Sequence, residues 1–180
     1  MAASLGEAPN YRDRCPLSWH PGATPGPDDA PERVLAAIAV IEESGTVANE
    51  DNDPVLAEIQ NLDAKLRLLM DMVQTLYQQQ AEQGPASEFV MSAEGIEITG
   101  EGKAPAAGEQ GLIALHLDSY VARPLRLPAE VLGLETEGSR WTARLRFTIE
   151  SEVLAGALEK HVFRRHRRAV AGARKDVAVT

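Results

Sequence analysis

Apolar residues recur at alternating spacings of four and three between Pro54 and Gln80, and this pattern limits the possible folds more than any other feature. It predicts a helix whose apolar stripe forms the a and d positions of a heptad repeat. Only 4% of the 180 residues are aromatic, so we expect one modest core and no room in it for such a stripe. The helix is therefore predicted to assemble with copies of itself. The stripe consists of Val55, Ile59, Leu62, Leu66, Leu69, Val73 and Leu76.

The residues beside this seam indicate how many helices assemble. Three of the four e positions are apolar, namely Leu56, Met70 and Tyr77, whereas Asp63 occupies the fourth. An apolar strip wider than a and d favours a core shared by more than two helices. We expect a homotetramer, with a trimer and then a dimer as alternatives. The competing interpretation is an amphipathic helix that packs on its own domain.

The chain before this helix shows two kinds of sequence. Residues 1–30 are rich in Pro and Gly and lack an apolar period, so they are predicted to be a disordered tail in which Cys15 is solvated. Residues 31–44 have a helical period and end before Gly45, and residues 45–53 form a polar linker to the heptad helix at 54–83. We expect the short helix to cover the outside of the bundle with its apolar face, which carries Val34, Leu35, Ile38 and Ile41.

From Ser87 onward the apolar period changes from helical to two. Strands are predicted at 87–92, 95–100, 112–117, 124–135 and 140–150, followed by a helix at about 151–171. The last strand is the clearest, because Trp141, Ala143, Leu145 and Phe147 alternate with Arg140, Thr142, Arg144 and Arg146. The helix is expected to turn Leu154, Leu158, Val162 and Phe163 toward the sheet. The predicted class is α+β: N-terminal helices that form an oligomeric coiled coil, a small antiparallel barrel and a C-terminal helix.

Charge and motifs exclude several classes of function. Residues 1–119 carry 6 Lys/Arg against 20 Asp/Glu, a net charge of −14, which argues against nucleic-acid binding. The chain has no nucleophile elbow, no phosphate loop and no metal-ligand spacing, so we expect neither catalytic residues nor a metal. It also has no apolar run of about 20 residues and no signal-like start, which predicts a cytoplasmic protein without membrane insertion.

Residues 120–180 are basic instead, with 12 Lys/Arg against 7 Asp/Glu and a net charge of +5. The helical sequence FRRHRRA places Arg164 and Arg168 four residues apart, with Arg165 near His161, and makes these arginines candidate contacts for a phosphate or carboxylate. The competing interpretation is that they solvate the helix and complement its dipole. The strand arginines likewise form either a basic patch or the solvated side of a sheet.

Residues 86–173 resemble the PilZ domain, a six-stranded barrel with a C-terminal helix found in bacterial cyclic di-GMP receptors. The resemblance rests on the strand order, the phrase FVMSAEGIEI and the RRHRR helix. Of the family motif Asp/Asn-x-Ser-x-x-Gly this chain keeps Ser92 and Gly95, but Val90 replaces the first residue. The family's RxxxR loop is expected shortly before this strand, where QTLYQQQAEQGPASE has no arginine.

Together with the heptad helix, this resemblance points to the non-typical, tetrameric PilZ proteins of xanthomonads. It implies a non-catalytic regulatory or adaptor protein of cyclic di-GMP signalling with a protein partner in motility, type IV pili or virulence. No cofactor is expected, because the expected position of the RxxxR loop has no arginine that could bind a dianionic dinucleotide. One alternative is a true cyclic di-GMP receptor that uses basic residues of the last strand and helix. A second is an enzyme with an unrecognised site.

Overall fold

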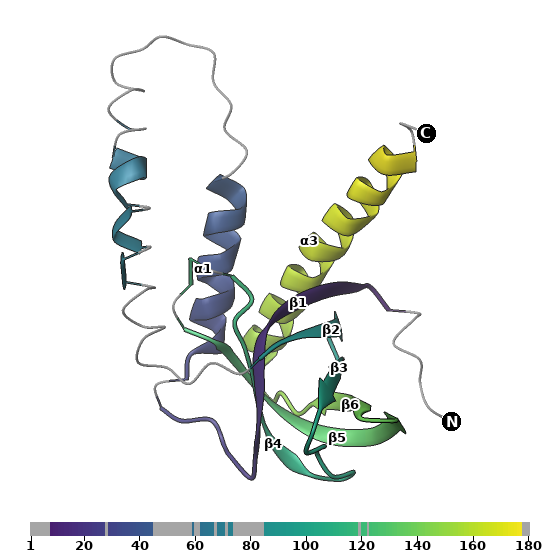
Figure 1. Cartoon of the computed structure of the whole chain (residues 1–180). Coiled ribbons are helices and arrows are strands. Elements are labelled where there is room, and N and C mark those ends of the chain that lie inside the picture. The colour runs from purple at the N-terminus through teal and green to yellow at the C-terminus, as the bar shows by residue number, and fades with distance from the viewer. Residues whose placement is uncertain are drawn as a thin grey trace.

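The computed structural model describes residues 8–27, 29–44, 59, 62–66, 68–70, 72–73, 85–118, 120–121 and 123–177. In these residues, antiparallel strands close into a barrel in the order β1-β2-β3-β6-β5-β4 (Figure 1). The strands are β1 (Asn10–Pro21), β2 (Ala86–Ser92), β3 (Gly95–Glu101), β4 (Gln110–Leu115), β5 (Leu125–Glu137) and β6 (Arg140–Phe147). The helices are α1 (Pro31–Ser44) and α3 (Glu152–Val177). The predicted barrel and C-terminal helix are therefore confirmed.

Strand β1 corrects the prediction of a disordered tail over residues 1–30. Its first half, Asn10–Pro16, pairs with β2, and its second half, Leu17–Pro21, pairs with β4. Tyr11, Cys15 and Leu17 point into the core. The barrel therefore starts at Asn10 and not at residue 86, and residues 22–85 are an insertion between its first two strands.

Cys15 was predicted to be a solvated thiol, and this is wrong. Its side chain is buried in the core, opposite Ser87 of β2. Burial raises the pKa of the Cys15 thiol to about 12, and nearby Asp13 adds to this effect. The thiol therefore stays protonated and packs as a small apolar group at neutral pH.

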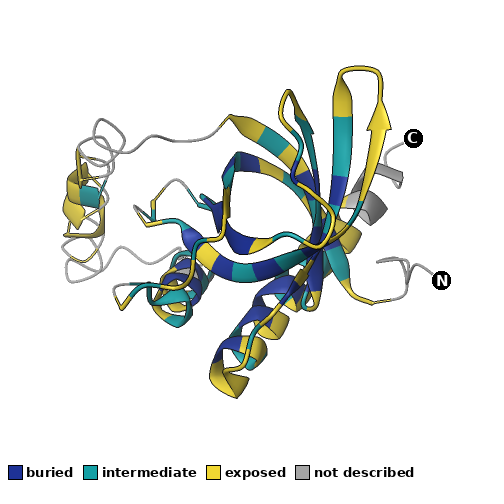
Figure 2. Cartoon of the chain, turned by 90° about the horizontal axis from the view of Figure 1, so that it is seen from below, coloured by how far each residue is buried: buried dark blue, intermediate teal, exposed yellow. Residues whose placement is uncertain are grey.

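Helix α1 has the predicted bounds but a different partner. Its apolar residues Val34, Leu35 and Ile38 join the barrel core, and the helix packs against α3 and β5. The expectation that this face covers the outside of a helical bundle is therefore wrong. Figure 2 shows buried positions along the inner wall of the barrel and on the helix faces that turn toward it.

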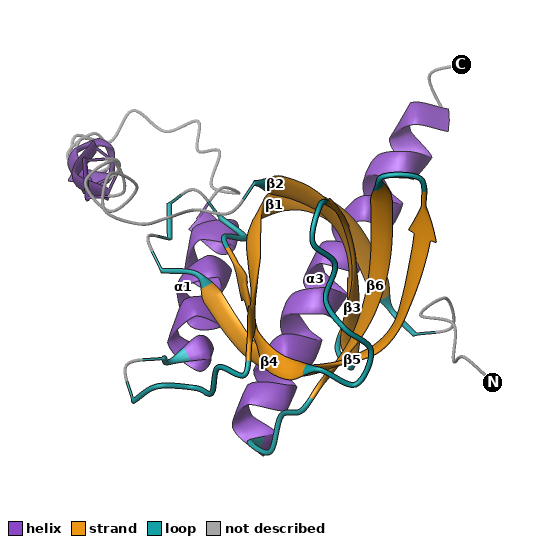
Figure 3. Ribbon diagram, turned by 60° about the horizontal axis from the view of Figure 1, so that its bottom comes forward, coloured by secondary structure: helices purple, strands orange, loops and turns teal. Residues whose placement is uncertain are grey.

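The sequence predicts a C-terminal tail at 174–180, but helix α3 extends to Val177 and includes residues 174–177. Leu154, Leu158 and Val162 are buried as predicted. Phe163 is half exposed, contrary to expectation, and lies under the Arg167 guanidinium at 5.8 Å. His161 is completely buried in the contact with the barrel. Figure 3 shows α1 and α3 side by side along one side of the barrel.

The heptad helix is described in part. Ile59 and residues 62–66, 68–70 and 72–73 are helical. The predicted linker at 45–53, the ends of the predicted helix at 54–83, and the tail residues 178–180 lie outside the described residues. So do four of the predicted assembly residues, Val55, Leu56, Leu76 and Tyr77.

The position of β1 predicts how the chain tolerates truncation. Deletion of residues 1–21 leaves β2 and β4 with unpaired edges and opens the barrel, so we expect cooperative thermal unfolding to disappear in circular dichroism. Deletion of residues 1–7, which ends before β1, is the matched control and should shift the melting temperature by less than about 3 °C. A cooperative transition in the longer deletion would contradict the assignment of β1 to the barrel.

Candidate functional site

The retained motif residues, Ser92 and Gly95, build the turn between β2 and β3. The buried Ser92 Oγ accepts hydrogen bonds from the backbone N–H groups of Glu94 and Gly95, each at 3.2 Å, and donates to the Gly95 carbonyl at 3.3 Å. A Cβ on Gly95 would collide with the carbonyl oxygen of Leu145 in β6. Both residues therefore have structural roles that need no ligand.

Val90 lies on the outer face of the barrel beside this turn. In register it sits between Arg12 of β1 and Glu97 of β3. Glu97 contacts Arg144 at 3.7 Å, and Arg144 also contacts Glu135 at 2.7 Å. A valine in this position offers a ligand no hydrogen bond.

The arginines of β6 were predicted to form either a basic patch or the solvated side of a sheet. Two of them have carboxylate partners, since Arg144 contacts Glu135 and Arg146 contacts Glu130 at 2.8 Å. The third, Arg140, lies opposite Glu101 of β3 and Glu137 of β5 in register. The outer face of β6 is therefore balanced in charge.

The closed barrel also changes where an RxxxR loop should be sought. Residues 1–9, which directly precede β1, contain neither Lys nor Arg. Arg12 and Arg14 follow inside β1, two residues apart. An RxxxR sequence is therefore absent from residues 1–9 as well as from the stretch before β2.

The structure brings the three candidate anion-binding arginines of α3 together around an internal carboxylate. Glu42 of α1 contacts Arg164 Nε at 3.2 Å, Arg165 Nε at 2.8 Å and Arg168 Nη1 at 3.2 Å. The Glu42 side chain is only 4% exposed. Arg168 also donates to the Glu42 carbonyl at 3.0 Å, and Arg165 lies 3.7 Å from Asp13.

Sequence reasoning found these arginines but missed Glu42. One signal was available, because an acidic residue in the last turn of α1, with no basic residue there, opposes the helix dipole. Such a carboxylate calls for a cation from elsewhere in the fold. We call Glu42, Arg164, Arg165 and Arg168 the arginine cluster.

His161 lies next to this cluster but contributes no charge to it at neutral pH. Its Nε2 atom is 3.0 Å from the Tyr11 hydroxyl, and the two rings meet edge to face. Burial lowers the pKa of His161 to about 3, and the positive charges of Arg165 and Arg164 act in the same direction. The imidazole is therefore a neutral hydrogen-bonding partner inside the core.

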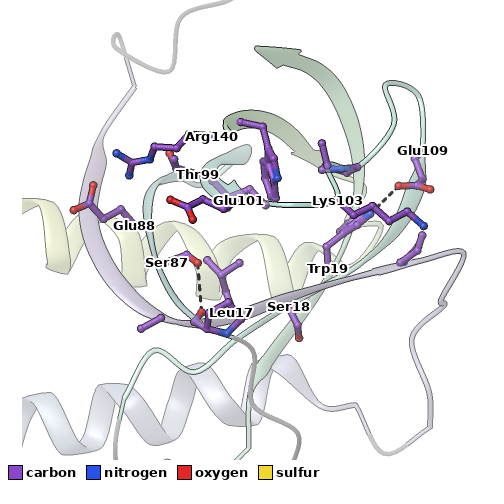
Figure 4. Close-up of a pocket in the computed structure, with 18 of the residues that line it drawn as sticks. Leu17, Ser18, Trp19, Ser87, Glu88, Thr99, Glu101, Lys103, Glu109 and Arg140 are labelled. Carbon is purple, nitrogen blue, oxygen red and sulfur yellow. Dashed lines mark hydrogen bonds between the residues drawn. The ribbon is translucent and has the colours of Figure 1, made fainter. Parts of the chain in front are cut away.

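The other end of the barrel is open and forms a pocket of about 930 Å³ that sequence reasoning did not find. Its floor includes Leu17 and Ile98, and both tryptophans of the chain, Trp19 and Trp141, line it. Figure 4 shows charged side chains around the opening. No sequence signal indicated this pocket, because Trp19 lies in the segment that was predicted to be a disordered tail.

The described part of the heptad helix exposes its seam. Five a and d residues are each more than half exposed: Ile59 57%, Leu62 61%, Leu66 52%, Leu69 61% and Val73 57%. A row of exposed apolar side chains along one helix is typical of an interaction surface. Among described residues, no group of His, Cys, Asp and Glu is placed to hold a metal ion, and no helix is long and apolar enough to span a membrane.

The arginine cluster predicts a specific loss of stability. Glu42→Gln leaves three guanidinium groups around a neutral amide. We therefore expect the free energy of unfolding, measured in urea, to fall by about 1–3 kcal/mol. Glu159→Gln, at an exposed position of α3, is the matched control and should change stability by less than about 0.5 kcal/mol. Equal stability of the two variants would show that the cluster does not hold α1 on α3.

Comparisons with known proteins identify the family to which this barrel belongs. No curated protein matches the chain. Among solved structures it is similar to a pathogenic protein from Xanthomonas campestris, described as a new tetrameric PilZ domain self-assembled via an unusual helical bundle. The TM-score is 0.75 at 29% sequence identity, over 93% of each chain. The family model described as "Atypical PilZ domain, cyclic di-GMP receptor" matches residues 35–175, and the chain therefore belongs to the atypical PilZ family.

Proposed function

We propose that this chain is a non-catalytic regulatory or adaptor protein of bacterial cyclic di-GMP signalling. In this proposal it assembles into a homotetramer through the heptad helix and presents four barrels to a protein partner in motility, type IV pili or virulence. It works in the cytoplasm and does not bind the dinucleotide in the usual manner of its family. Four barrels on one stalk would strengthen weak contacts by raising the effective concentration of the partner.

The exposed seam is the observation that carries the assembly part. Leu62, Leu66 and Leu69 are each more than half exposed along one helical segment, so a single chain leaves them in water. Burial of a leucine side chain yields about 1.5–3 kcal/mol, and several such residues in each of four helices are enough to hold a bundle. The similar Xanthomonas campestris protein is described as a tetramer formed by a helical bundle, which supports the same arrangement here.

Two observations support indirect rather than direct use of the dinucleotide. The motif position Val90 is apolar, and residues 1–9 contain no Lys or Arg. Five basic residues that could contact a phosphate already have carboxylate partners. Arg164, Arg165 and Arg168 contact Glu42 of α1, and Arg144 and Arg146 of β6 contact Glu135 and Glu130 of β5. A phosphate would have to displace these carboxylates before it could bind.

The alternative is a true cyclic di-GMP receptor. The family description, which names a receptor, favours it. In that case the arginine cluster would exchange the Glu42 carboxylate for a ligand phosphate, since both groups form charge-assisted hydrogen bonds with guanidinium.

Assembly can be tested by light scattering. The native protein is expected to have a mass near four times 19.4 kDa. Leu69→Asp places a charge in the bundle core and should dissociate the assembly while the barrel keeps its thermal transition. Leu68→Asp is the matched control, because Leu68 is equally exposed but occupies a c position outside the seam. A monomeric native protein, or dissociation by both variants alike, would refute assembly through this seam.

Calorimetric titration with cyclic di-GMP separates the two functions. We expect no binding tighter than about 100 μM, because Val90 is apolar at the motif position and Arg164, Arg165 and Arg168 already contact the Glu42 carboxylate. Micromolar binding that Arg164→Ala or Arg168→Ala abolishes would establish the receptor instead. Arg167→Ala, on the same helix but outside the arginine cluster, controls for a general loss of positive charge.

A further inference from the structure

The open end of the barrel has the aromatic and apolar composition that is typical of the centre of a protein interface. The indole rings of Trp19 and Trp141 stand over an apolar floor that includes Leu17 and Ile98, both of which belong to the buried core. Glycine permits this arrangement, because a Cβ on Gly100 would collide with the Trp141 ring. Tryptophan is the residue type most enriched at the energetic centres of protein interfaces. The mouth of a barrel is also a common site for ligands.

The rim of this pocket is charged but balanced. Its cations are Arg14, Lys103 and Arg140, and its carboxylates are Glu88, Glu101 and Glu109. Arg14 lies opposite Glu88 in the β1–β2 register, and Arg140 lies opposite Glu101 in the β3–β6 register. A rim with equal numbers of both charges does not select a strongly anionic ligand. An apolar centre inside a polar rim is instead the usual anatomy of a protein interface.

The Glu109 carboxylate fixes one wall of the pocket. It accepts hydrogen bonds from Trp19 Nε1 at 3.0 Å and from the Ala106 backbone N–H at 3.3 Å. These contacts hold the Trp19 ring and the loop after β3 in place together. The apolar centre is thus preformed, which reduces the entropy lost when a ligand binds. Figure 4 shows Trp19, Glu109 and Lys103 on one side of the opening, and Glu88, Arg140 and Thr99 on the other.

The pocket is separate from the motif turn. Strand β2 begins at the pocket with Ala86 and ends at Ser92, and β3 returns from Gly95 to Glu101 at the pocket. The two sites therefore lie at opposite ends of one hairpin. The wall also includes Pro85 and Ala86, where the chain re-enters the barrel after the insertion.

We propose that the barrel mouth binds a peptide segment of a partner protein through one aromatic side chain. The aromatic ring enters the pocket between Trp19 and Trp141, and the peptide on either side of it meets the mixed charges of the rim. This proposal rests on the proposed function, because it assigns the surface through which a regulatory protein would engage its partner. It depends neither on the oligomeric state nor on the absence of dinucleotide binding.

The test uses the full-length protein and a phage-displayed library of random peptides. Selection is carried out on the native protein, with depletion on Ser87→Phe, whose added ring fills the mouth from β2. Enriched sequences are expected to share one aromatic residue flanked by charged or polar residues. Synthetic peptides, free of tryptophan, are then titrated while the emission of Trp19 and Trp141 reports occupancy, since the chain has no other tryptophan.

Binding should weaken by about tenfold or more when the aromatic residue of the peptide becomes alanine. A similar loss is expected for Ser87→Phe and for Ala104→Phe, which blocks the pocket from a loop and keeps the test valid if Ser87→Phe folds poorly. Ala37→Phe, on an exposed face of α1, should bind like the native protein.

Three outcomes would overturn the proposal. The first is that no peptide distinguishes the native protein from the blocked variants. The second is that alanine replaces the aromatic residue without loss of affinity. The third is that cyclic di-GMP displaces the peptide and itself changes tryptophan emission, which would make the mouth a nucleotide site. The tetramer mass is an independent measurement in all three cases. The calorimetric titration is independent of the first two outcomes, so these failures are distinguishable from failure of the proposed function, whereas in the third outcome calorimetry would detect the dinucleotide directly.

Discussion

The pairing of β1 with both β2 and β4 is the constraint on which the remaining structure depends. It closes the barrel across the whole of residues 22–85, and the Leu17 N–H donates to the Pro85 carbonyl at 3.3 Å. The entropy of closing a loop grows only with the logarithm of its length, so a long insertion adds little to the cost of the barrel. An assembly helix can therefore be placed in the insertion while both of its ends stay anchored to one small fold.

The arginine cluster holds the C-terminal end of α1 against α3. Glu42 stands in the last turn of α1, where the helix dipole disfavours a carboxylate, and three guanidinium groups of α3 offset that cost. The contact fixes the end of α1 against the barrel immediately before the chain continues toward the heptad seam.

Elements that carry their own period could be predicted from the sequence, and this explains the success with α1, β2 to β6 and α3. Strand β1 was not predicted, because Asp13 interrupts the inward alternation of Tyr11, Cys15, Leu17 and Trp19. In addition, Pro16 lies within the strand and Pro21 ends it. The arginine cluster could not be predicted from the sequence for another reason. Arg164 is 122 residues away from Glu42, and no local pattern reports which carboxylate will face a basic helix. The barrel mouth depends on side chains from five separate segments and has no sequence signature.

The partial motif at the β2–β3 turn shows how folding and ligand binding can be separated within a few residues. Ser92 caps the turn and Gly95 permits the approach of β6, so replacing either one would strain the barrel. Val90 faces outward and takes part neither in the turn nor in the contact with β6, so its side chain can change without loss of the fold. The two residues retained from the family motif are those that the barrel needs, and the replaced residue lies at a position that the barrel does not need. A motif match at this turn is consequently a sound indicator of the fold and a weak indicator of dinucleotide binding.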